Sequence, residues 1–258
     1  TLIPQSVLVI GRTTLSRSIN AFIKSSPITY VVDQRLATVD TDRQADRKFT
    51  ELPDLQGVIQ SDEWIAKWAK VSERAQKLIA SLDGWNEAVI ARTIAAALPN
   101  ETALFVSSSR PIRDLEGFAA PRTGIDVYAN RGLAGIDGNI STALGIAYAH
   151  KATIAVLGDL SFLHDLTGLI NKEAINCRFI VINNDGGGIF STLPQRGVNG
   201  FETVFGTPHG LNPAAIAQSM GVNAKQVTTV QELEAEIKAP ISGISVVVCD
   251  VPNRESNA

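Results

Sequence analysis

The chain has 258 residues, of which 45% are hydrophobic and 19% are charged, and its formal net charge is −3 at pH 7. This composition is typical of a globular protein with one large or two smaller cores. The small negative charge gives no basic field for nucleic acid, so a nucleic-acid partner is not expected. No apolar run reaches the roughly 18 residues of a membrane span, so stable membrane insertion is not expected either.

The first residues, Thr1–Gln5, lack the basic head and the long apolar stretch of a signal peptide. Because the chain does not begin with Met, we interpret it as a mature or cut product whose N-terminal part is missing. The two cysteines, Cys177 and Cys249, each lie in or beside a strand-like apolar run. This favours buried thiols in a reducing compartment, the cytoplasm, and no Cys or His lies near them at metal-ligand spacing.

Strand and helix patterns alternate from the start of the chain. Ser6–Gly11 and Ile28–Val32 have the pattern of buried strands, with a helix predicted over Thr13–Lys24 between them, which makes a βαβ unit. The passage Asp40–Lys48 is polar and has no clear periodicity. Asp62–Leu82 has apolar residues at helical spacing.

A linker between two domains is predicted near residues 50–62. It divides the chain into a first domain, residues 1–55, and a second domain, residues 56–258. The second domain begins with the helical pattern Asp62–Leu82 and a second amphipathic helix, Asn86–Leu98. The polar end of the chain, Asn253–Ala258, is expected to fray.

Five further strands follow in regular order, and helical patterns separate most of them. The predicted strands are Ala103–Ser107, Ile125–Tyr128, Thr153–Leu157, Phe179–Asn183 and Ile244–Cys249. The predicted helices are Gly138–His150, Leu163–Asn176, Pro213–Met220 and Val230–Lys238. Strands with helical crossovers predict an α/β fold with a parallel sheet flanked by helices on both faces, in which ligands bind at the carboxyl ends of the strands.

Polar residues follow two of these strands directly. Thr153–Leu157 runs into Gly158-Asp159-Leu160-Ser161, and Phe179–Asn183 runs into Asn184-Asp185-Gly186-Gly187-Gly188. If the two strands are neighbours, Asp159 and Asn184 emerge at the same edge of the sheet, and their oxygens suit Mg²⁺ or Ca²⁺ with room for a diphosphate. Gly158 allows a tight turn, and Ser161 can cap the next helix, whose N-terminus favours an anion. The structural alternative is turn chemistry and helix capping alone.

The two elements together, 25 residues apart from Asp159 to Asn184, resemble the thiamine diphosphate-binding motif. The resemblance implies that the side chains of Asp159 and Asn184 and the carbonyl of Gly186 hold Mg²⁺, which holds the cofactor diphosphate. The commonest form of the motif has Gly where this chain has Leu160, which weakens the match to the general pattern.

Several segments narrow the resemblance: Asn130–Gly138, Gly158–Asp165, Asn183–Ser191, Phe201-Glu202 and Phe205–Gly210. They resemble segments of one family, the 2-succinyl-5-enolpyruvyl-6-hydroxy-3-cyclohexene-1-carboxylate synthases of menaquinone biosynthesis. The second of them matches the family variant, including the Leu. The similarity covers most of residues 100–250 and continues less specifically into residues 1–50, so residues 1–55 resemble the C-terminal part of a central α/β domain and residues 56–258 the pyrophosphate-binding domain.

The resemblance also implies roles near the reacting centre. Ile136 is expected as the apolar wedge under the cofactor, and Arg113 and Arg131 are expected to grip substrate carboxylates bidentately. Ser109 is expected to hydrogen-bond substrate. Ile189 and Phe190 are expected to shape the apolar wall beside the reacting carbon, with His209 a weaker candidate. The structural alternatives are core packing for the apolar residues, a helix cap for Ser109 and solvated surface positions for the arginines.

The implied reaction is the decarboxylation of 2-oxoglutarate and conjugate addition of the remaining unit to isochorismate. Thiamine diphosphate carries the organic chemistry, and the protein supplies position and electrostatics. In such synthases a Glu from a separate pyrimidine-binding domain promotes activation of the cofactor, at a site between two chains. We find no counterpart of that domain, so we expect a homodimer or homotetramer in the full-length protein and no synthase activity of this chain alone.

Three other interpretations remain at this point. The first is another thiamine diphosphate enzyme of the acetolactate synthase or 2-oxo acid decarboxylase group. The second is a cofactor-binding fragment without catalysis. The third is a dinucleotide-binding domain, suggested by Gly11 after the first strand, but a lone Gly lacks the three-glycine fingerprint.

Overall fold

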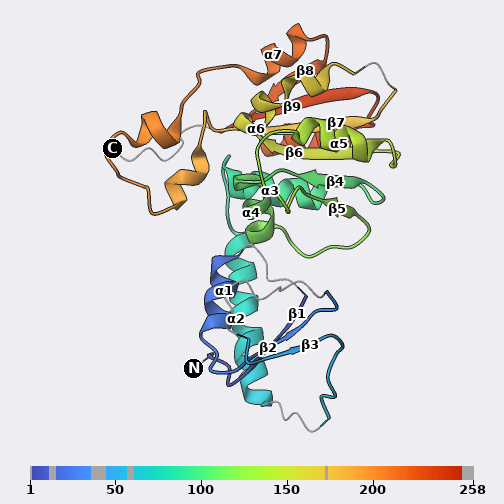
Figure 1. Ribbon diagram of the computed structural model, residues 1–258. Coiled ribbons are helices and arrows are strands. Elements are labelled where there is room, and N and C mark those ends of the chain that lie inside the picture. The colour runs from blue at the N-terminus through green and yellow to red at the C-terminus, as the bar shows by residue number, and fades with distance from the viewer. Residues whose placement is uncertain (1, 12–15, 36–44, 57–60, 172–173, 252–258) are drawn as a thin grey trace. The chain divides into compact units, whose positions relative to one another are not determined.

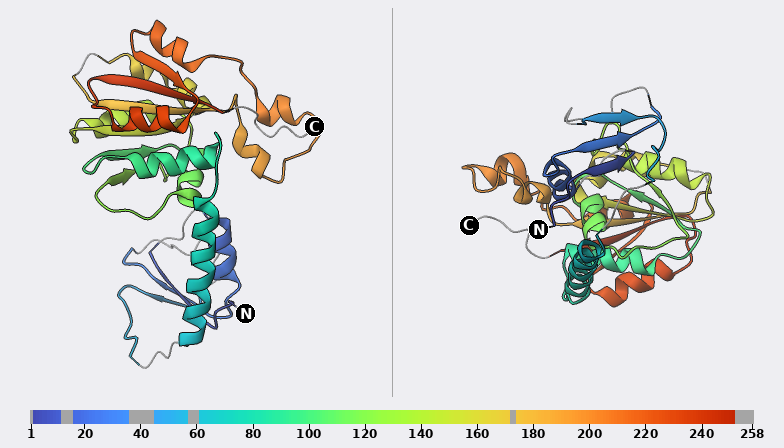
Figure 2. Two further views of the ribbon diagram at one scale, coloured as in Figure 1. Left: turned by 180° about the vertical axis from the view of Figure 1, so that it is seen from behind. Right: turned by 90° about the horizontal axis from the view of Figure 1, so that it is seen from below.

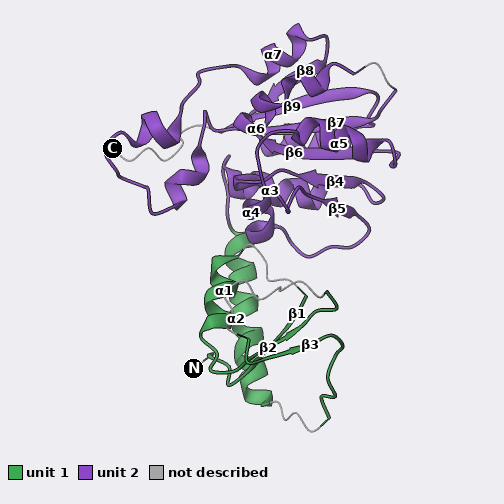
Figure 3. Cartoon of the chain, viewed as in Figure 1, with its two compact units in different colours: residues 1–81 green, residues 82–258 purple. Residues whose placement is uncertain are grey.

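The computed structural model describes residues 2–11, 16–35, 45–56, 61–171 and 174–251. The chain divides into two compact units, Thr1–Ser81 and Leu82–Ala258 (Figure 3). The division falls later than the predicted boundary at residue 55, because the helix Asp62–Ala80 packs within the first unit through an edge-to-face contact between Phe22 and Trp68 at 5.4 Å. The predicted frayed end, Asn253–Ala258, lies outside the described residues.

Among its described residues, the first unit contains a parallel sheet in the order β1-β2-β3 and two helices (Figure 1). Their bounds are β1 Val7–Ile10, β2 Thr29–Val32, β3 Arg47–Phe49, α1 Arg17–Lys24 and α2 Asp62–Ala80. The predicted βαβ unit is confirmed for the described residues; α1 starts after the N-cap Ser16, and residues 13–15 of the predicted helix lie outside the description. Strand β3 was not predicted, since it is a short polar edge strand.

The second unit contains a six-stranded parallel sheet in the order β5-β4-β6-β7-β9-β8, seen from two further sides in Figure 2. The strands are β4 Ala103–Val106, β5 Asp126–Tyr128, β6 Thr153–Gly158, β7 Cys177–Asn183, β8 Asn223–Val227 and β9 Ile244–Asp250. All five predicted strands are confirmed. The sixth, β8, was missed because it is an edge strand with only two buried residues, Ala224 and Val227, which the exposed Lys225 and Gln226 separate.

Helices connect these strands. They are α3 Glu87–Ala97, α4 Arg110–Phe118, α5 Asn139–Ala147, α6 Asp159–His164, α7 Pro213–Ser219 and α8 Val230–Lys238, with 3-10 helices at Leu166–Leu169 and Gly188–Thr192 and a π-helix at Glu202–Gly206. The single helix predicted over Leu163–Asn176 is wrong for the described part of that range, which excludes residues 172–173. Helix α6 instead ends at His164, and Gly168 in the following 3-10 helix lies so close to α5 that a Cβ there would be 2.9 Å from Ile140 Cγ2. Of the helices within the described residues, none is long and apolar enough to span a bilayer.

The sheet of the second unit is covered on both faces, as the strand pattern predicted. Side chains that alternate along β4, β6, β7 and β9 enter two separate apolar clusters. One face packs against α5, α6 and α7 through Ile140, Phe162 and Ala217. The other packs against α3 and α8 through Ile94 and Leu233. Burial on both faces explains why the central strands are continuous apolar runs.

Arg178 on β7 connects the sheet to the end of α8. It is 6% exposed, and its guanidinium donates to the carbonyls of Glu236, Ala239 and Pro240. We expect Arg178→Met to lower the free energy of unfolding by about 2–4 kcal/mol, because three partly buried carbonyls lose the buried guanidinium that donates to them. Urea denaturation measures this. Lys238→Met, a change of an exposed side chain on α8, is the control and should lower the free energy of unfolding by less than about 0.5 kcal/mol. Equal losses for the two variants would contradict the role of Arg178.

The two cysteines are free and buried, as predicted. Burial raises the pKa of the Cys177 thiol to about 12, and burial, with a smaller contribution from Asp250, raises the pKa of Cys249 as well. At pH 8 the thiolate fraction of Cys177 is then on the order of 1 in 10⁴, far below that of a free cysteine. We expect neither thiol to react with a disulfide reagent in the folded protein, and both to react in urea. Rapid modification without denaturant would contradict the burial of these strands.

Candidate metal and cofactor site

The site is built where β6 and β7 end. The two strands are parallel neighbours, and Gly158 pairs with Ile182 at their carboxyl ends. Asp159 and Asn184 therefore leave the sheet at the same edge, as the sequence predicted. Gly158 itself is extended, with φ −79° and ψ 161°, so the predicted tight turn is wrong; instead, no atom lies within 4 Å of the position that a Cβ would take there. That open space leaves room for a ligand to approach the backbone.

Asp159 is a buried carboxylate, with 2% of its surface exposed. Its Oδ1 accepts from Leu160 N at 2.7 Å, and its Oδ2 accepts from Gly186 N at 2.7 Å. Burial raises the pKa of Asp159, and the backbone N–H groups of Gly186 and Leu160 and the side chain of His209 partly offset this effect. A buried carboxylate of this kind is stabilised by a cation that replaces its lost water.

Asn184 is the second polar side chain at this edge and is 7% exposed. Its Nδ2 donates to Glu87 Oε1 at 2.8 Å. Its Oδ1 is buried and has no hydrogen-bond partner. Since buried amide oxygens normally accept a hydrogen bond, this unpaired oxygen indicates a site for a ligand, and an oxygen donor suits Mg²⁺.

Gly186, the third predicted metal ligand, has φ 125°, a conformation that requires glycine. Its N–H points to Asp159, while its carbonyl accepts from Gly188 N at 2.9 Å. A carbonyl oxygen has two lone pairs, so one remains for a further partner. The oxygens of Asp159, Asn184 and Gly186 are therefore of the type that suits a hard cation, although both Asp159 oxygens and the Gly186 carbonyl already accept hydrogen bonds within the protein.

Ser161 does not cap a helix, contrary to the prediction. It lies inside α6, which begins at Asp159, and its hydroxyl donates to the carbonyl of Ile136 at 3.0 Å. It also accepts from Asn139 Nδ2 at 2.8 Å. Ser161 therefore fixes the loop that carries Ile136, the predicted wedge, beside the Asp159 segment.

The predicted substrate residues fall in different segments. Ser109 lies just after β4 with φ 75° and ψ −132°, a strained conformation for a residue other than glycine, and its carbonyl accepts from Arg113 Nη1 at 2.8 Å. These two residues are linked, at the end of the strand next to β6. Arg131 lies in a different segment, the exposed loop between β5 and α5.

The predicted apolar wall lies on the 3-10 helix Gly188–Thr192. Ile189 and Phe190 are half-buried there, and the Phe190 ring packs against Phe205 with centroids 5.3 Å apart. Gly187 allows this approach, since a Cβ at that position would lie 2.1 Å from the carbonyl oxygen of Phe205.

Two residues at the site were missed or underrated. Glu87, in the first turn of α3, matches the ordinary preference of a helix start for acidic residues, and no local signal connects it to Asn184. His209 Nδ1 accepts from Leu211 N, which places the proton of a neutral ring on Nε2, 3.2 Å from Asp159 Oδ2. The motif around His209 was visible, but its approach to Asp159 was not.

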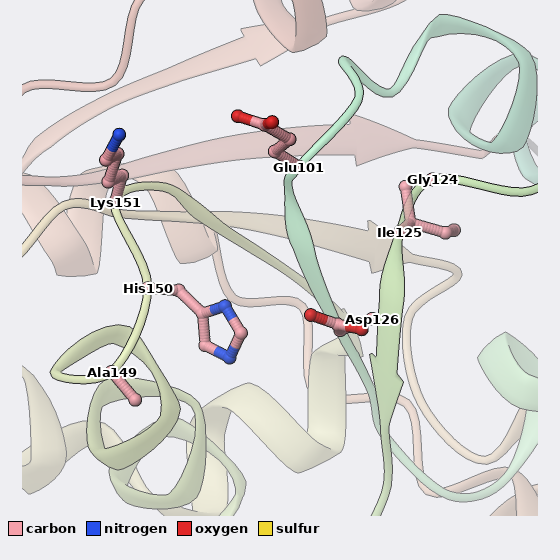
Figure 4. A pocket seen from close by; sticks show the side chains of 7 residues that line it. All are labelled: Glu101, Gly124, Ile125, Asp126, Ala149, His150 and Lys151. Atoms are coloured by element: carbon pink, nitrogen blue, oxygen red, sulfur yellow. The ribbon is translucent and has the colours of Figure 1, made fainter.

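A pocket lies at the opposite edge of the same sheet, before β4, β5 and β6 (Figure 4). It is lined by Glu101, Gly124, Ile125, Asp126, Ala149, His150 and Lys151. Because it faces the amino ends of the strands, it is separated from the Asp159 edge by the length of the sheet. Ligands of open parallel sheets bind at the carboxyl ends, which favours the Asp159 edge as the functional site.

Comparison with known proteins agrees with this site. The family model described as "Thiamine pyrophosphate enzyme, C-terminal TPP binding domain" matches residues 113–251, more than half of the chain. The chain is also similar to proteins named 2-succinyl-5-enolpyruvyl-6-hydroxy-3-cyclohexene-1-carboxylate synthase. One from Thermobifida fusca is 38% identical over 89% of this chain and 44% of the relative. Another, from Nocardia farcinica, is 35% identical over 95% of this chain and 47% of the relative.

A third, from Bacillus cytotoxicus, is 33% identical over 98% of this chain and 47% of the relative. The chain therefore spans somewhat less than half the length of these curated relatives. The matched residues contain both strand ends of the site, with Asp159 and Asn184. The chain belongs to the thiamine pyrophosphate enzyme family, with a C-terminal cofactor-binding domain over residues 113–251, and resembles the 2-succinyl-5-enolpyruvyl-6-hydroxy-3-cyclohexene-1-carboxylate synthases along most of its length.

Proposed function

We propose that this chain anchors Mg²⁺ and thiamine diphosphate for a synthase that decarboxylates 2-oxoglutarate and adds the remaining unit to isochorismate. The observation that carries the proposal is the buried, unpaired Oδ1 of Asn184 at the strand end next to Asp159. The similarity of 32–38% identity to synthases of that name supports the choice of reaction.

Within the proposal, the side chains of Asp159 and Asn184 and the carbonyl of Gly186 hold Mg²⁺. The open space beside Gly158 admits the diphosphate close to the backbone. When bound, thiamine diphosphate supplies the carbon nucleophile and the electron sink for decarboxylation of a 2-oxo acid. Ser161 holds the loop that carries Ile136, which supports the cofactor from below.

Arg113 and Arg131 bind the carboxylates that both substrates carry, since a guanidinium matches a carboxylate bidentately. The hydrogen bond from Arg113 to the Ser109 carbonyl holds Arg113 and Ser109 together at the end of β4. The Ser109 hydroxyl is then a further substrate contact. Ile189 and Phe190 form an apolar wall that excludes water from the reacting carbon. We further propose that the protein works as a homodimer or homotetramer in the cytoplasm, where its two free thiols stay reduced.

Calorimetry with thiamine diphosphate, with MgCl₂ and then with EDTA, tests the cofactor site. We expect binding that requires the metal. Carbon dioxide release from 2-oxoglutarate by the intact protein, with and without isochorismate, tests the reaction. Turnover that requires isochorismate is expected. Turnover of pyruvate without it would instead favour the acetolactate synthase or 2-oxo acid decarboxylase group, and metal-dependent binding without any turnover would favour a cofactor-binding unit alone.

A further inference from the structure

Glu87 contacts the candidate metal site through Asn184, although the two residues are 97 positions apart. Glu87 Oε1 accepts from Asn184 Nδ2 at 2.8 Å, and Glu87 Oε2 lies 3.0 Å from Arg110 Nη2. Arg110 Nε in turn donates to Asp114 Oδ2 at 3.0 Å. The four side chains thus form a continuous relay from α4, across the start of α3, to the loop after β7.

The hydrogen-bond chemistry of this relay determines which way the Asn184 amide faces. A carboxylate only accepts hydrogen bonds, so Glu87 requires the NH₂ end of the amide on its side. The amide oxygen must then face away, which is the buried, unpaired Oδ1. A flipped amide would place its oxygen against the carboxylate and leave an NH₂ group, which cannot bind a cation, in the site.

The surroundings hold Glu87 itself in place. The side chain is 20% exposed, and Arg110, at 23% exposed, is a donor-only group that binds its second oxygen. The backbone of Gly188 also lies close to the amide, since a Cβ at Gly188 would lie 2.3 Å from Asn184 Nδ2. Glu87 and the backbone of Gly188 therefore both restrict the amide.

We propose that Glu87 is a positioning residue that orients Asn184, with Arg110 as its support, so that the amide oxygen is presented to the metal. The inference rests on the proposed function, since it assigns a role to the Asn184 oxygen in Mg²⁺ binding. Residues of this kind, which orient a ligand without touching the metal, commonly change metal affinity by about 10–100-fold when replaced.

The variant Glu87→Gln tests whether the side chain at position 87 sets the orientation of the Asn184 amide. The side-chain volume at position 87 stays nearly constant. Arg110 still requires an oxygen, so the new amide turns its oxygen to Arg110 and its NH₂ to Asn184. Asn184 must then turn its own oxygen toward position 87 and away from the metal. We expect Mg²⁺-dependent binding of thiamine diphosphate to weaken about 10–100-fold in calorimetry.

The double variant Glu87→Gln with Arg110→Met supplies the matched control. Without Arg110, the Gln is free to turn its oxygen to Asn184, so affinity should recover in part, although a further contact has been removed. Arg110→Met alone should weaken binding less than Glu87→Gln. If Glu87 only connected α3 to the loop after β7, each lost contact would add, and the double variant would bind the cofactor most weakly of the three. That result would overturn the inference.

A measurement on the unaltered protein without cofactor completes the test. The side-chain amide protons of Asn184, assigned in an NMR spectrum by their loss in Asn184→Asp, should exchange slowly with solvent. Fast exchange would show that Glu87 does not hold the amide and would overturn the inference even if Glu87→Gln failed to fold. If wild-type protein shows no metal-dependent cofactor binding, the proposed function fails; if it binds and Glu87→Gln binds equally well, only the positioning role fails.

Discussion

The variant Asp159→Asn is expected to weaken Mg²⁺-dependent binding of thiamine diphosphate by at least about 100-fold. The carboxylate is 2% exposed and supplies the negative charge among the three proposed metal ligands. An amide of the same size keeps an oxygen but no charge, so the attraction for a divalent cation falls sharply in this buried setting. Calorimetric titration of thiamine diphosphate in MgCl₂ measures the change.

Asp126→Asn is the matched control for this prediction. It also removes one negative charge from the second unit, but Asp126 is exposed and lines the pocket at the opposite edge of the sheet (Figure 4). Its cofactor affinity should stay within about twofold of wild type, since exposed charges this far away are screened. If Asp159→Asn bound as well as Asp126→Asn, Asp159 would not be a metal ligand. Urea denaturation of each variant checks that a loss of binding does not reflect unfolding.

The sequence predicted the central part of the fold well, because burial on both faces leaves a clear pattern. Strands β6 and β7 are continuous apolar runs, each followed by polar residues and glycine, so the pattern predicted both strands and their parallel direction, although β7 begins at Cys177, two residues before the predicted start. That the two strands are neighbours was a condition of the site prediction, and the structure meets it. The edge strands β3 and β8 lack this signal, since one of their sides is solvated. Residue type alone therefore did not distinguish them from loops.

The sequence predicted where the proposed ligands lie in the fold, but not which residues contact them. Asp159 and Asn184 follow strand ends, a position that the chain order fixes. Glu87 and His209 reach the site from 97 and 50 residues away, and each has a sufficient local explanation, at a helix start and in a Gly/Pro-rich loop. Ser161 shows the reverse error: a helix cap was the local expectation, and a contact to Ile136, 25 residues earlier, is what the fold provides.

Gly188→Ala is expected to have the second large effect, through crowding instead of charge. The added Cβ would lie 2.3 Å from Asn184 Nδ2, 2.9 Å from its Cγ and 3.1 Å from its Oδ1. The amide cannot move away without losing its 2.8 Å bond to Glu87. We expect a loss of about 1–3 kcal/mol in the free energy of unfolding, and cofactor binding about 10–100-fold weaker in calorimetry.

Gly145→Ala separates this effect from the general consequence of adding a methyl group. Gly145 lies in α5, and no atom lies within 4 Å of the position of its Cβ. Because Ala favours a helix over Gly by up to about 1 kcal/mol, this variant should be more stable than wild type and bind the cofactor unchanged. Should Gly188→Ala also bind normally, Asn184 would tolerate a displaced amide, and a metal ligand at that position would be ruled out. A protein that needs its Asn184 oxygen in one place has no such tolerance, since a displacement of even about 1 Å exceeds the spread of Mg²⁺–oxygen distances.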